Sequence, residues 1–255
     1  MTARLALDAV TIALGGRDIV TSVSATAHAG SLVAVTGPNG AGKSTLLRAL
    51  AGLVAHRGTI RIADRPLASR TPQERARLIG YLPQGHTTHW PLSVREIAGL
   101  GRFAHGATDP RRLSSGDRAR VDRALAETGL TPLADRQATT LSGGERARLA
   151  LARVLVQDTP IVLADEPVAS LDPRYQIEVM TLLRQMAASG VLVVAVTHDL
   201  IHAARFADRV MVLDQGRLVR DDIPASALDA ACLATTFGIV AGTPLAEAAL
   251  PWQLA

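Results

Sequence analysis

The sequence predicts an α/β fold, in which a mainly parallel β-sheet is covered by helices and interrupted by a helical insertion. Apolar runs carry this prediction, because a strand that is covered on both faces is hydrophobic along its whole length. The runs are SLVAVTG at 31–37, IVLAD at 161–165 and VLVVAVTHD at 191–199. Segments with helical periodicity lie between them, and such an alternation of strands and helices is typical of a parallel sheet.

The remaining elements follow in chain order. Residues 5–35 predict short strands separated by glycine and aspartate turns, one of them at Gly15–Gly16. Residues 92–140 have helical periodicity broken by glycine and proline, which predicts the insertion. A helix is expected over STLLRALAGL, residues 44–53, where leucines recur at helical spacing at Leu46, Leu47, Leu50 and Leu53.

We therefore predict a single domain over residues 1–255 that has three parts. The core comprises 1–84 and 157–220, and it begins with an antiparallel β subdomain. A helical subdomain covers 85–156, and residues 221–255 form a C-terminal tail. The sequence contains no internal repeat or long coiled-coil pattern that would change this division.

Composition indicates a soluble cytosolic protein. The chain of 255 residues is 48% hydrophobic but only 3% aromatic, so aliphatic side chains form its core. No apolar run approaches the roughly 18 residues of a membrane-spanning helix. Residues 1–10 lack the charged start and unbroken apolar stretch of a signal peptide. Cys232 is the only cysteine, which excludes an internal disulfide and fits a reducing compartment.

The basic residues give two indications. The formal net charge is only +4 and the arginines are scattered, whereas nucleic-acid binding requires a dense basic face. Among the 27 basic residues the only lysine is Lys43. A position that keeps lysine in an arginine-rich chain is expected to need a compact ammonium rather than a planar guanidinium.

A glycine-rich loop surrounds this lysine. Its pattern, G-x-x-x-x-G-K-[ST], lies between a predicted strand and a predicted helix, where backbone N–H groups form a concave site for phosphate. Lys43 is expected to reach the β- and γ-phosphates, and the Ser44 hydroxyl to coordinate Mg²⁺. A chance glycine-rich loop before a lysine is the alternative, and the strand–helix context argues against it. The predicted nucleotide-binding residues are Gly37, Pro38, Asn39, Gly40, Ala41, Gly42, Lys43, Ser44 and Thr45.

Two carboxylates end the apolar run IVLAD. Asp165 and Glu166 lie at the carboxyl end of this strand, which is where ligands bind in open α/β sheets. Asp165 is suited to hold Mg²⁺, and Glu166 to orient and deprotonate an attacking water. An acidic turn after a strand is the structural alternative, but the preceding phosphate loop favours the chemical interpretation.

A second candidate anion site lies at LSGGE, residues 141–145. Ser142 and Glu145 have the spacing of a helix capping box, and the glycines at 143 and 144 let an anion approach the helix start. An ordinary N-cap would explain the serine and glutamate alone. The segment resembles the signature motif of ABC transporter ATPases, and the other motifs of that family follow in order. Gln84 resembles the Q-loop, Ser170–Asp172 the D-loop and His198 the H-loop.

This resemblance extends from about Leu5 to Val219 and implies a fold and a mechanism. The fold is a P-loop NTPase with a RecA-like parallel sheet. ATP and Mg²⁺ bind between two copies of the chain arranged head to tail, each phosphate loop facing the partner's Ser142, Gly143 and Gly144. The implied catalytic residues are Glu166, His198, Gln84 and Lys43, and the implied Mg²⁺ ligands are Ser44, Gln84 and Asp165.

The resemblance also implies partners and a location. Gln84 reports the cycle to integral membrane permease subunits, and a periplasmic or lipoprotein substrate-binding protein delivers the cargo. The chain is then expected at the cytoplasmic face of the bacterial inner membrane, and it is not expected to bind nucleic acid.

One position departs from the family. ABC ATPases usually carry an aromatic residue, which stacks on adenine, some two dozen residues before the phosphate loop. Leu14 occupies that position here, and no aromatic residue precedes Tyr81. Either an aliphatic surface meets the adenine or Arg17 stacks on it.

The subfamily is suggested by the region around the Q-loop. ERARLIGYLPQ at 74–84 and PLSVREIAGLGRFAHG at 91–106 resemble importers of ferric siderophores, haem and cobalamin. The pair Gly101–Arg102 is typical of them, residues 103–105 match in part, and FGIVAG at 237–242 resembles their tail. Import of another metal, such as zinc or manganese, and a non-transport ABC ATPase remain alternatives. A P-loop kinase or GTPase leaves LSGGE and His198 unexplained.

Overall fold

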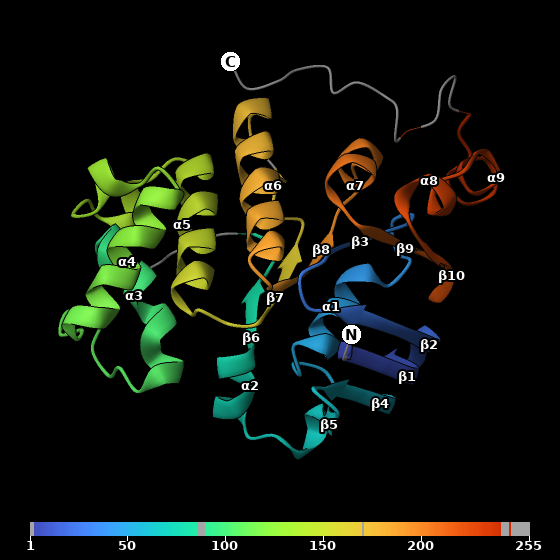
Figure 1. Ribbon diagram of the computed structural model, residues 1–255, viewed down its shortest axis with the longest axis horizontal. Coiled ribbons are helices and arrows are strands. Elements are labelled where there is room, and N and C mark those ends of the chain that lie inside the picture. Colours follow the sequence, from blue (N-terminus) through green and yellow to red (C-terminus); the bar gives the residue numbers. More distant parts are fainter. Residues whose placement is uncertain (1–2, 86–89, 170, 241–244, 246–255) are drawn as a thin grey trace.

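The computed structural model describes residues 3–85, 90–169, 171–240 and 245, and contains a six-stranded sheet at its centre (Figure 1). The strand order is β10-β9-β3-β8-β7-β6. All neighbouring pairs are parallel except β9 and β10, which form an antiparallel hairpin. The strands are β3 (Leu32–Thr36), β6 (Ile79–Leu82), β7 (Ile161–Asp165), β8 (Leu192–Val196), β9 (Arg209–Asp214) and β10 (Arg217–Asp222). Every residue of β3, β7 and β8 is buried, which confirms the prediction from the apolar runs.

A smaller antiparallel sheet has the order β2-β1-β4-β5, and comprises β1 (Ala3–Leu14), β2 (Arg17–His28), β4 (Arg57–Ile62) and β5 (Arg65–Pro66). The strands predicted on either side of the Gly15–Gly16 turn are present, and β1 and β2 are longer than expected, at 12 residues each. β1 contains an irregularity at Ala9, which has φ 48° and where the pairing register shifts. The Ala9 N–H donates to Ser24 Oγ instead of a main-chain carbonyl, so the strand continues through it.

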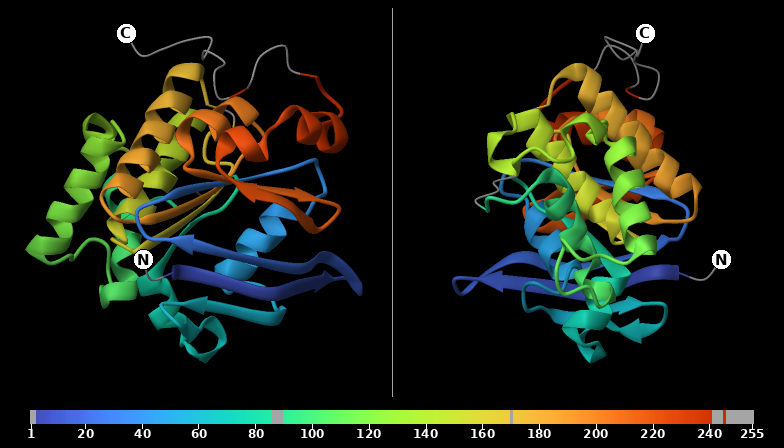
Figure 2. Two further views of the ribbon diagram at one scale, coloured as in Figure 1. Left: turned by 45° about the vertical axis from the view of Figure 1, so that its right-hand side comes forward. Right: turned by 90° about the vertical axis from the view of Figure 1, so that its left-hand side faces the viewer.

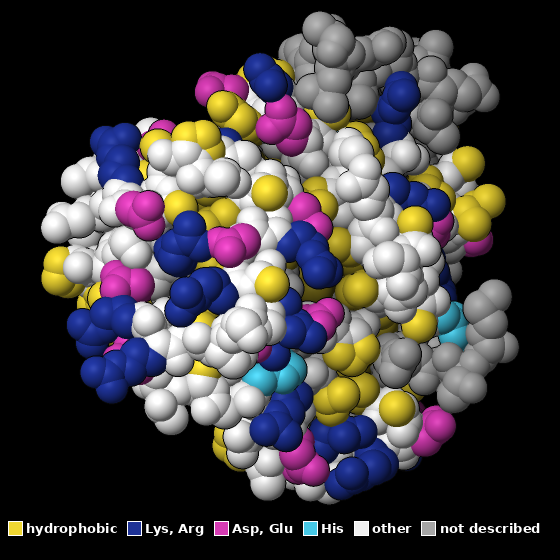
Figure 3. All heavy atoms as spheres, turned by 60° about the vertical axis from the view of Figure 1, so that its left-hand side comes forward, with side chains coloured by type: hydrophobic (Ala, Val, Ile, Leu, Met, Phe, Trp, Pro, Cys, Tyr) yellow, Lys and Arg dark blue, Asp and Glu magenta, His cyan; other side chains and the backbone are white. Residues whose placement is uncertain are grey.

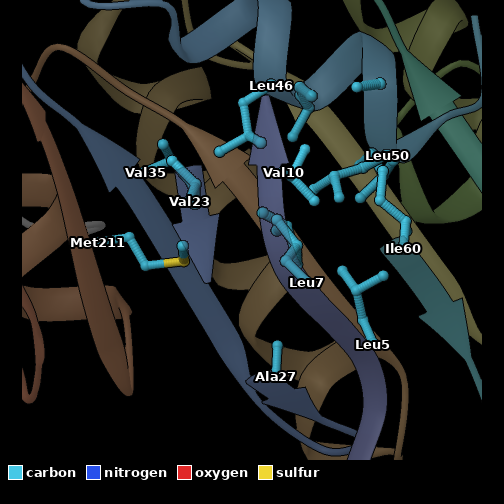
Figure 4. Packing of buried hydrophobic residues seen from close by; sticks show 14 of the residues in the cluster. Leu5, Leu7, Val10, Val23, Ala27, Val35, Leu46, Leu50, Ile60 and Met211 are labelled. Carbon is cyan, nitrogen blue, oxygen red and sulfur yellow. The ribbon is translucent and has the colours of Figure 1, made fainter. Parts of the chain in front are cut away.

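Helix α1 (Lys43–Leu50) lies between the two sheets (Figure 2). Its buried leucines join a core cluster with Leu5 and Ile60 of the small sheet and Val35 of β3 (Figure 4). The helix ends three residues earlier than predicted. Gly52 adopts φ +71°, a left-handed conformation that terminates helices, and Leu53 is 60% exposed rather than part of the core.

Other helices cover the opposite face of the six-stranded sheet. α5 (Gly143–Val156) and α6 (Pro173–Ala188) share a second core cluster with β3, β7 and β8. α7 (Leu200–Phe206) joins a third cluster with β9, as do α8 (Pro224–Ala227) and α9 (Ala230–Cys232). The turn of π-helix η5 (Leu233–Phe237) follows α9.

The segment between β6 and β7 forms the helical region on the left of Figure 1. It contains α3 (Val94–Gly99), η2 (Leu100–His105), α4 (Ser115–Glu127), η3 (Thr131–Leu133), η4 (Ala138–Thr140) and α5. Buried side chains from α3, α4 and α5 form a separate core cluster in this region. The short elements η1 (Leu67–Ser69) and α2 (Pro72–Leu78) precede β6. Within the described ranges, no helix is both long and apolar enough to span a bilayer.

Candidate active site

The glycine-rich loop connects β3 to α1 and depends on two glycines for close packing. A Cβ at Gly37, where φ is +143°, would lie 1.9 Å from the carbonyl oxygen of Leu213. A Cβ at Gly42, where φ is +95°, would lie 2.8 Å from Val20 Cγ2. Because real side chains do not make such contacts, both positions require glycine. The loop is thus held between β9 and β2, and α1 begins at Lys43 immediately after it.

The Lys43 side chain folds back over this loop. Its Nζ donates hydrogen bonds to the carbonyl oxygens of Gly37 (2.8 Å) and Pro38 (2.9 Å), and the residue is only 6% exposed. Burial of the ammonium lowers the pKa of Lys43, while the carboxylates of Glu166 and Asp165 act in the opposite direction. The lone lysine of the chain therefore lies where the sequence places a phosphate-binding cation.

Ser44 and Asp165 meet from distant parts of the sequence. The Ser44 hydroxyl donates to Asp165 Oδ1 over 2.9 Å. Asp165 is fully buried at the end of β7, and this burial raises the pKa of its carboxyl group, although the Ser44 hydrogen bond opposes the shift. Its Oδ2 is buried without a hydrogen-bond partner among the described residues. A buried oxygen of this kind is a group that a cation can satisfy.

Glu166 is the centre of a second group. Its backbone is left-handed, with φ 53°, and its N–H donates to the carbonyl oxygen of Val196 on β8. Gln84 Nε2 donates to one carboxylate oxygen over 2.8 Å, and His198 Nε2 contacts the other. Three residues that the sequence analysis selected from separate motifs are therefore in direct contact.

These residues border one open cleft of about 640 Å³ at the carboxyl ends of the central strands. The lining residues are Leu14, Ile19, Asn39, Gly40, Gly42, Lys43, Ser44, Thr45, Gln84, Glu166 and His198. Ile19 was not predicted as a cleft residue, because the sequence of a strand does not distinguish a cleft-lining isoleucine from a core one. Arg17, the alternative partner for adenine, is exposed and is not among the lining residues.

The segment LSGGE caps α5 as predicted. Ser142 Oγ accepts a hydrogen bond from the Glu145 N–H, and Glu145 Oε2 accepts one from the Ser142 N–H. Ser142 and Gly143 are exposed, and neither they nor Gly144 line the cleft of their own chain. Of the predicted D-loop, Ser170 lies outside the described residues, while Asp172 is the N-cap residue of α6.

Comparison with known families decides the class of protein. The family described as "ABC transporter" matches residues 20–169, which span the phosphate loop, LSGGE and both carboxylates. The chain belongs to the ABC transporter family. It is an ATP-binding subunit of the α/β P-loop type, an ATPase whose activity is coupled to transport, as the motifs predicted.

Curated relatives of this ABC ATPase include two named hemin import ATP-binding protein HmuV. The protein from Rhodococcus jostii is 42% identical over 92% of this chain and 80% of its own length. The protein from Nocardia farcinica is 46% identical over 83% of this chain and 73% of its own length. This similarity agrees with the subfamily suggested by the Q-loop region.

Solved ABC structures have the same fold. CbiO1 from Clostridium perfringens, part of the transporter complex cbiONQ, is 28% identical with a TM-score of 0.77 and covers 89% of this chain and 90% of its own. The cassette MJ0796, a dimer bound to ADP and phosphate in a post-hydrolysis state, is 28% identical with a TM-score of 0.77. That match covers 86% of this chain and 98% of MJ0796.

Gly101 and Arg102 lie away from the nucleotide cleft of this ABC ATPase. A Cβ at Gly101 would lie 2.4 Å from the carbonyl oxygen of Arg153, so glycine lets η2 approach α5 closely. Arg102 is 6% exposed and donates to Asp117 Oδ1 (2.7 Å) and to the carbonyl oxygen of Val156 (2.9 Å). Gly101 and Arg102 therefore hold η2 against the C-terminal end of α5, and their role is structural.

Proposed function

We propose that this chain hydrolyses ATP to drive the uptake of haem or a related metal chelate into a bacterial cell. The convergence of Lys43, Ser44, Gln84, Glu166 and His198 on one cleft is the observation that carries the ATPase part. The cargo is supported by the curated relatives, whose names state hemin import, and by the Q-loop region. The ATPase itself does not contact the cargo, so the cargo follows from relatedness and not from the cleft.

Mg²⁺ fits the residues at the end of β7. We assign it to Ser44 Oγ, Asp165 and Gln84, because Asp165 Oδ2 is a buried and unpartnered anionic oxygen. The described residues hold no cluster of three or more His, Cys, Asp or Glu side chains that could ligate a metal. A site with few protein ligands suits Mg²⁺, which also takes phosphate oxygens and water. When bound, the ion neutralises charge on the phosphates.

Each of the cleft side chains then has its own role in ATP hydrolysis. Lys43 and the loop N–H groups bind the β- and γ-phosphates, since a buried ammonium and free N–H groups stabilise negative charge. Glu166 accepts a proton from the attacking water. Gln84 and His198 each contact one carboxylate oxygen of Glu166. One of these contacts therefore opens when the carboxylate turns toward water. His198 is then free to contact the γ-phosphate.

Two copies of the chain are needed in this scheme. Gly143 and Gly144 carry N–H groups of the first turn of α5 and follow the exposed N-cap residue Ser142, but none of the three lines the cleft of its own chain. A head-to-tail dimer lets this segment cover the γ-phosphate bound by the partner. ATP then favours the closed dimer because it contacts both chains there, and hydrolysis removes that advantage.

The remaining partners follow from the transport function. Integral membrane permease subunits contact the chain near Gln84, and a periplasmic or lipoprotein binding protein delivers the chelate. The chain lies at the cytoplasmic face of the inner membrane. We do not expect nucleic acid as a partner: on the one face in Figure 3, Lys and Arg side chains are interspersed with acidic and apolar side chains.

Transport in proteoliposomes tests this function. The chain is co-purified with its permease and reconstituted with the binding protein outside the vesicles. Hemin uptake is measured with ATP inside and with Lys43→Ala as the control. We expect ATP-dependent hemin accumulation that the Lys43→Ala chain does not support. Uptake of zinc or manganese without hemin would contradict the cargo. Co-purification with ribosomes or DNA and with no membrane protein would contradict a role in transport.

A further inference from the structure

The segment that leads into the capping box of α5 is held by one arginine. Arg136 Nε donates a hydrogen bond to Thr140 Oγ1 over 2.9 Å, and its Nη2 donates one to the carbonyl oxygen of Thr140 over 3.2 Å. Thr140 is the last residue of η4 and precedes Ser142, the N-cap residue of α5, by two positions. A guanidinium presents its donors in a fixed fork, so two bonds to one residue fix its orientation as well as its position.

The main chain on both sides of this contact is anchored to the start of α3. The Val94 N–H donates to the carbonyl oxygen of Arg136 over 2.9 Å. The Ala138 N–H donates to the carbonyl oxygen of Leu92 over the same distance. Val94 and Ala138 are also buried in one core cluster of the helical region. Arg136 therefore holds Thr140 from a part of the chain that is itself fixed.

The surroundings of Arg136 indicate a role in the signature segment rather than in stability. Arg136 and Thr140 are exposed, so their contact contributes little to the free energy of unfolding. The pKa of Glu145 is lowered mainly by the hydrogen bond from the Ser142 N–H, and the positive charge of Arg136 acts in the same direction. Neither Arg136 nor Thr140 lines the nucleotide cleft of its own chain. An effect of this contact on hydrolysis must therefore arise through the segment Ser142–Gly144.

We propose that Arg136 is a positioning residue for ATP hydrolysis, which holds Thr140 so that the segment Ser142–Gly144 is correctly placed in the partner's site. This inference rests on the proposed head-to-tail dimer and adds a residue outside LSGGE to the half-site that each chain supplies. Hydrogen bonds from helix N–H groups to an anion depend on distance and angle, so a shift of this segment weakens them. The phosphate loop of the same chain is not affected.

Substitutions at both ends of the contact test the named residues. Arg136→Ala should lower the kcat of ATP hydrolysis about 5–10-fold, as expected for the loss of one or two hydrogen bonds. The affinity of the monomeric chain for mant-ATP should not change. Arg136→Lys should not restore kcat, because an ammonium lacks the fork that reaches both oxygens. Thr140→Val, which removes the hydroxyl, should also lower kcat, whereas Thr140→Ser, which keeps it, should not.

Two results of these assays would overturn the inference. One is an unchanged kcat in Arg136→Ala, and the other is a loss of mant-ATP affinity as large as the loss of kcat, which would place the defect in the chain's own phosphate loop. The control is Arg112→Ala, at an exposed arginine whose side chain forms no hydrogen bond or ion pair within the described ranges. We expect this variant to hydrolyse ATP at the wild-type rate.

Mixtures of variants show which site of the dimer depends on Arg136. Paired with Lys43→Ala, the Arg136→Ala chain supplies an intact phosphate loop and meets an intact Ser142 segment. This mixture should exceed the summed ATPase activity of the separate chains. Paired with Ser142→Arg, the Arg136→Ala chain supplies the weakened segment to the one remaining site, so this mixture should not exceed the sum. Ser142→Arg mixed with Lys43→Ala is the control.

The outcomes distinguish this inference from the proposed function. Excess activity in the control mixture, but none in Arg136→Ala with Lys43→Ala, would overturn the role of Arg136 and leave the shared sites intact. Excess activity in Arg136→Ala with Ser142→Arg would overturn it as well. No excess in the control mixture would contradict the head-to-tail arrangement, and the role of Arg136 with it.

Discussion

The Ser44 hydroxyl donates a hydrogen bond to Asp165 Oδ1 over 2.9 Å, although 121 positions separate the two residues. The bond joins the first turn of α1 to the end of β7. It is possible because β3 and β7 are parallel members of one sheet, so both strands deliver their following residues to the same edge. The phosphate loop and the acidic pair are thereby combined into a single site.

Replacing Asp165 by Asn is expected to stabilise the ligand-free chain and abolish Mg²⁺-dependent hydrolysis. Burial raises the pKa of Asp165. The contribution of this carboxyl group to the free energy of unfolding is therefore complete below the ordinary aspartate pKa, and it is lost as pH rises through the raised pKa. At neutral pH the buried charge therefore costs stability, which asparagine avoids. We expect a gain of about 1–3 kcal/mol in the free energy of unfolding.

Urea unfolding across a pH series, without nucleotide or Mg²⁺, measures this gain. The difference between Asp165→Asn and wild type should be largest at neutral pH and should shrink as pH falls toward the raised pKa. Asp172→Asn, at the N-cap of α6 where the side chain makes no capping hydrogen bond within the described part of the chain, is the control. If Asp165→Asn is instead less stable than wild type at neutral pH, contacts in the fold stabilise the Asp165 carboxylate by more than its burial costs.

The lone lysine gives a chemical test of the phosphate loop. An amine-selective reagent has Lys43 as its only side-chain target, with the N-terminal amine as an internal reference. Mg-ATP should protect Lys43, because phosphate contacts bury its ammonium further, and should leave the reference labelling unchanged. Peptide mass mapping measures both sites. Equal labelling of Lys43 with and without Mg-ATP would contradict its assignment.

Lys43→Arg should lose hydrolysis although it keeps the charge. The Lys43 ammonium fits between the carbonyl oxygens of Gly37 and Pro38, whereas a planar guanidinium is larger and presents its donors in a fixed fork. A phosphate-release assay checks this outcome. Normal turnover in Lys43→Arg would mean that the compact ammonium is not required.

The sequence predicted those parts of the site that depend on contiguous residues. The phosphate loop and the capping box at Ser142 are local patterns, and fully buried strands are visible as apolar runs. The register shift of β1 at Ala9 was not predictable, because it depends on a hydrogen bond to Ser24 of another strand. Ile19 was missed for a similar reason, since only tertiary packing brings it beside Gly42. The bonds of Glu166 to Gln84 and His198 likewise depend on the fold.

The Arg102–Asp117 ion pair is expected to contribute to stability through its burial. Arg102→Met leaves the Asp117 carboxylate unpaired and removes a donor from the carbonyl oxygen of Val156. We expect a loss of about 2–3 kcal/mol, less than for a fully buried pair because Asp117 keeps some solvent contact. The exposed residue Arg112 supplies the control Arg112→Met, with a change within about 0.5 kcal/mol.

The double variant Arg102→Met/Asp117→Leu separates pairing from packing in the same urea unfolding experiment. It should recover part of the loss, because replacing both charges leaves no unpaired carboxylate. If the double variant is as unstable as the sum of the two single variants, the ion pair is not the source of the effect.

Complementation tests the proposed sharing of active sites between chains. Ser142→Arg should bind ATP at its own phosphate loop but fail to complete the site of its partner. Lys43→Ala disables its own phosphate loop but keeps Ser142. A mixed dimer therefore contains one site in which both the phosphate loop and the partner's Ser142 segment are intact. We expect mixtures to exceed the summed ATPase activity of the separate variants, once differently tagged chains are shown to exchange. Activity no greater than that sum would contradict the head-to-tail arrangement.

If Glu166 activates the water that attacks ATP in this cleft, Glu166→Gln should separate ATP binding from hydrolysis. Phosphate release is measured at saturating Mg-ATP, with binding measured in parallel and Glu178→Gln, a partly exposed acid on α6, as the control. We expect unchanged ATP binding and hydrolysis slowed by roughly 10²–10⁴-fold, because glutamine cannot accept the proton. Near-normal hydrolysis in Glu166→Gln would exclude Glu166 from this role.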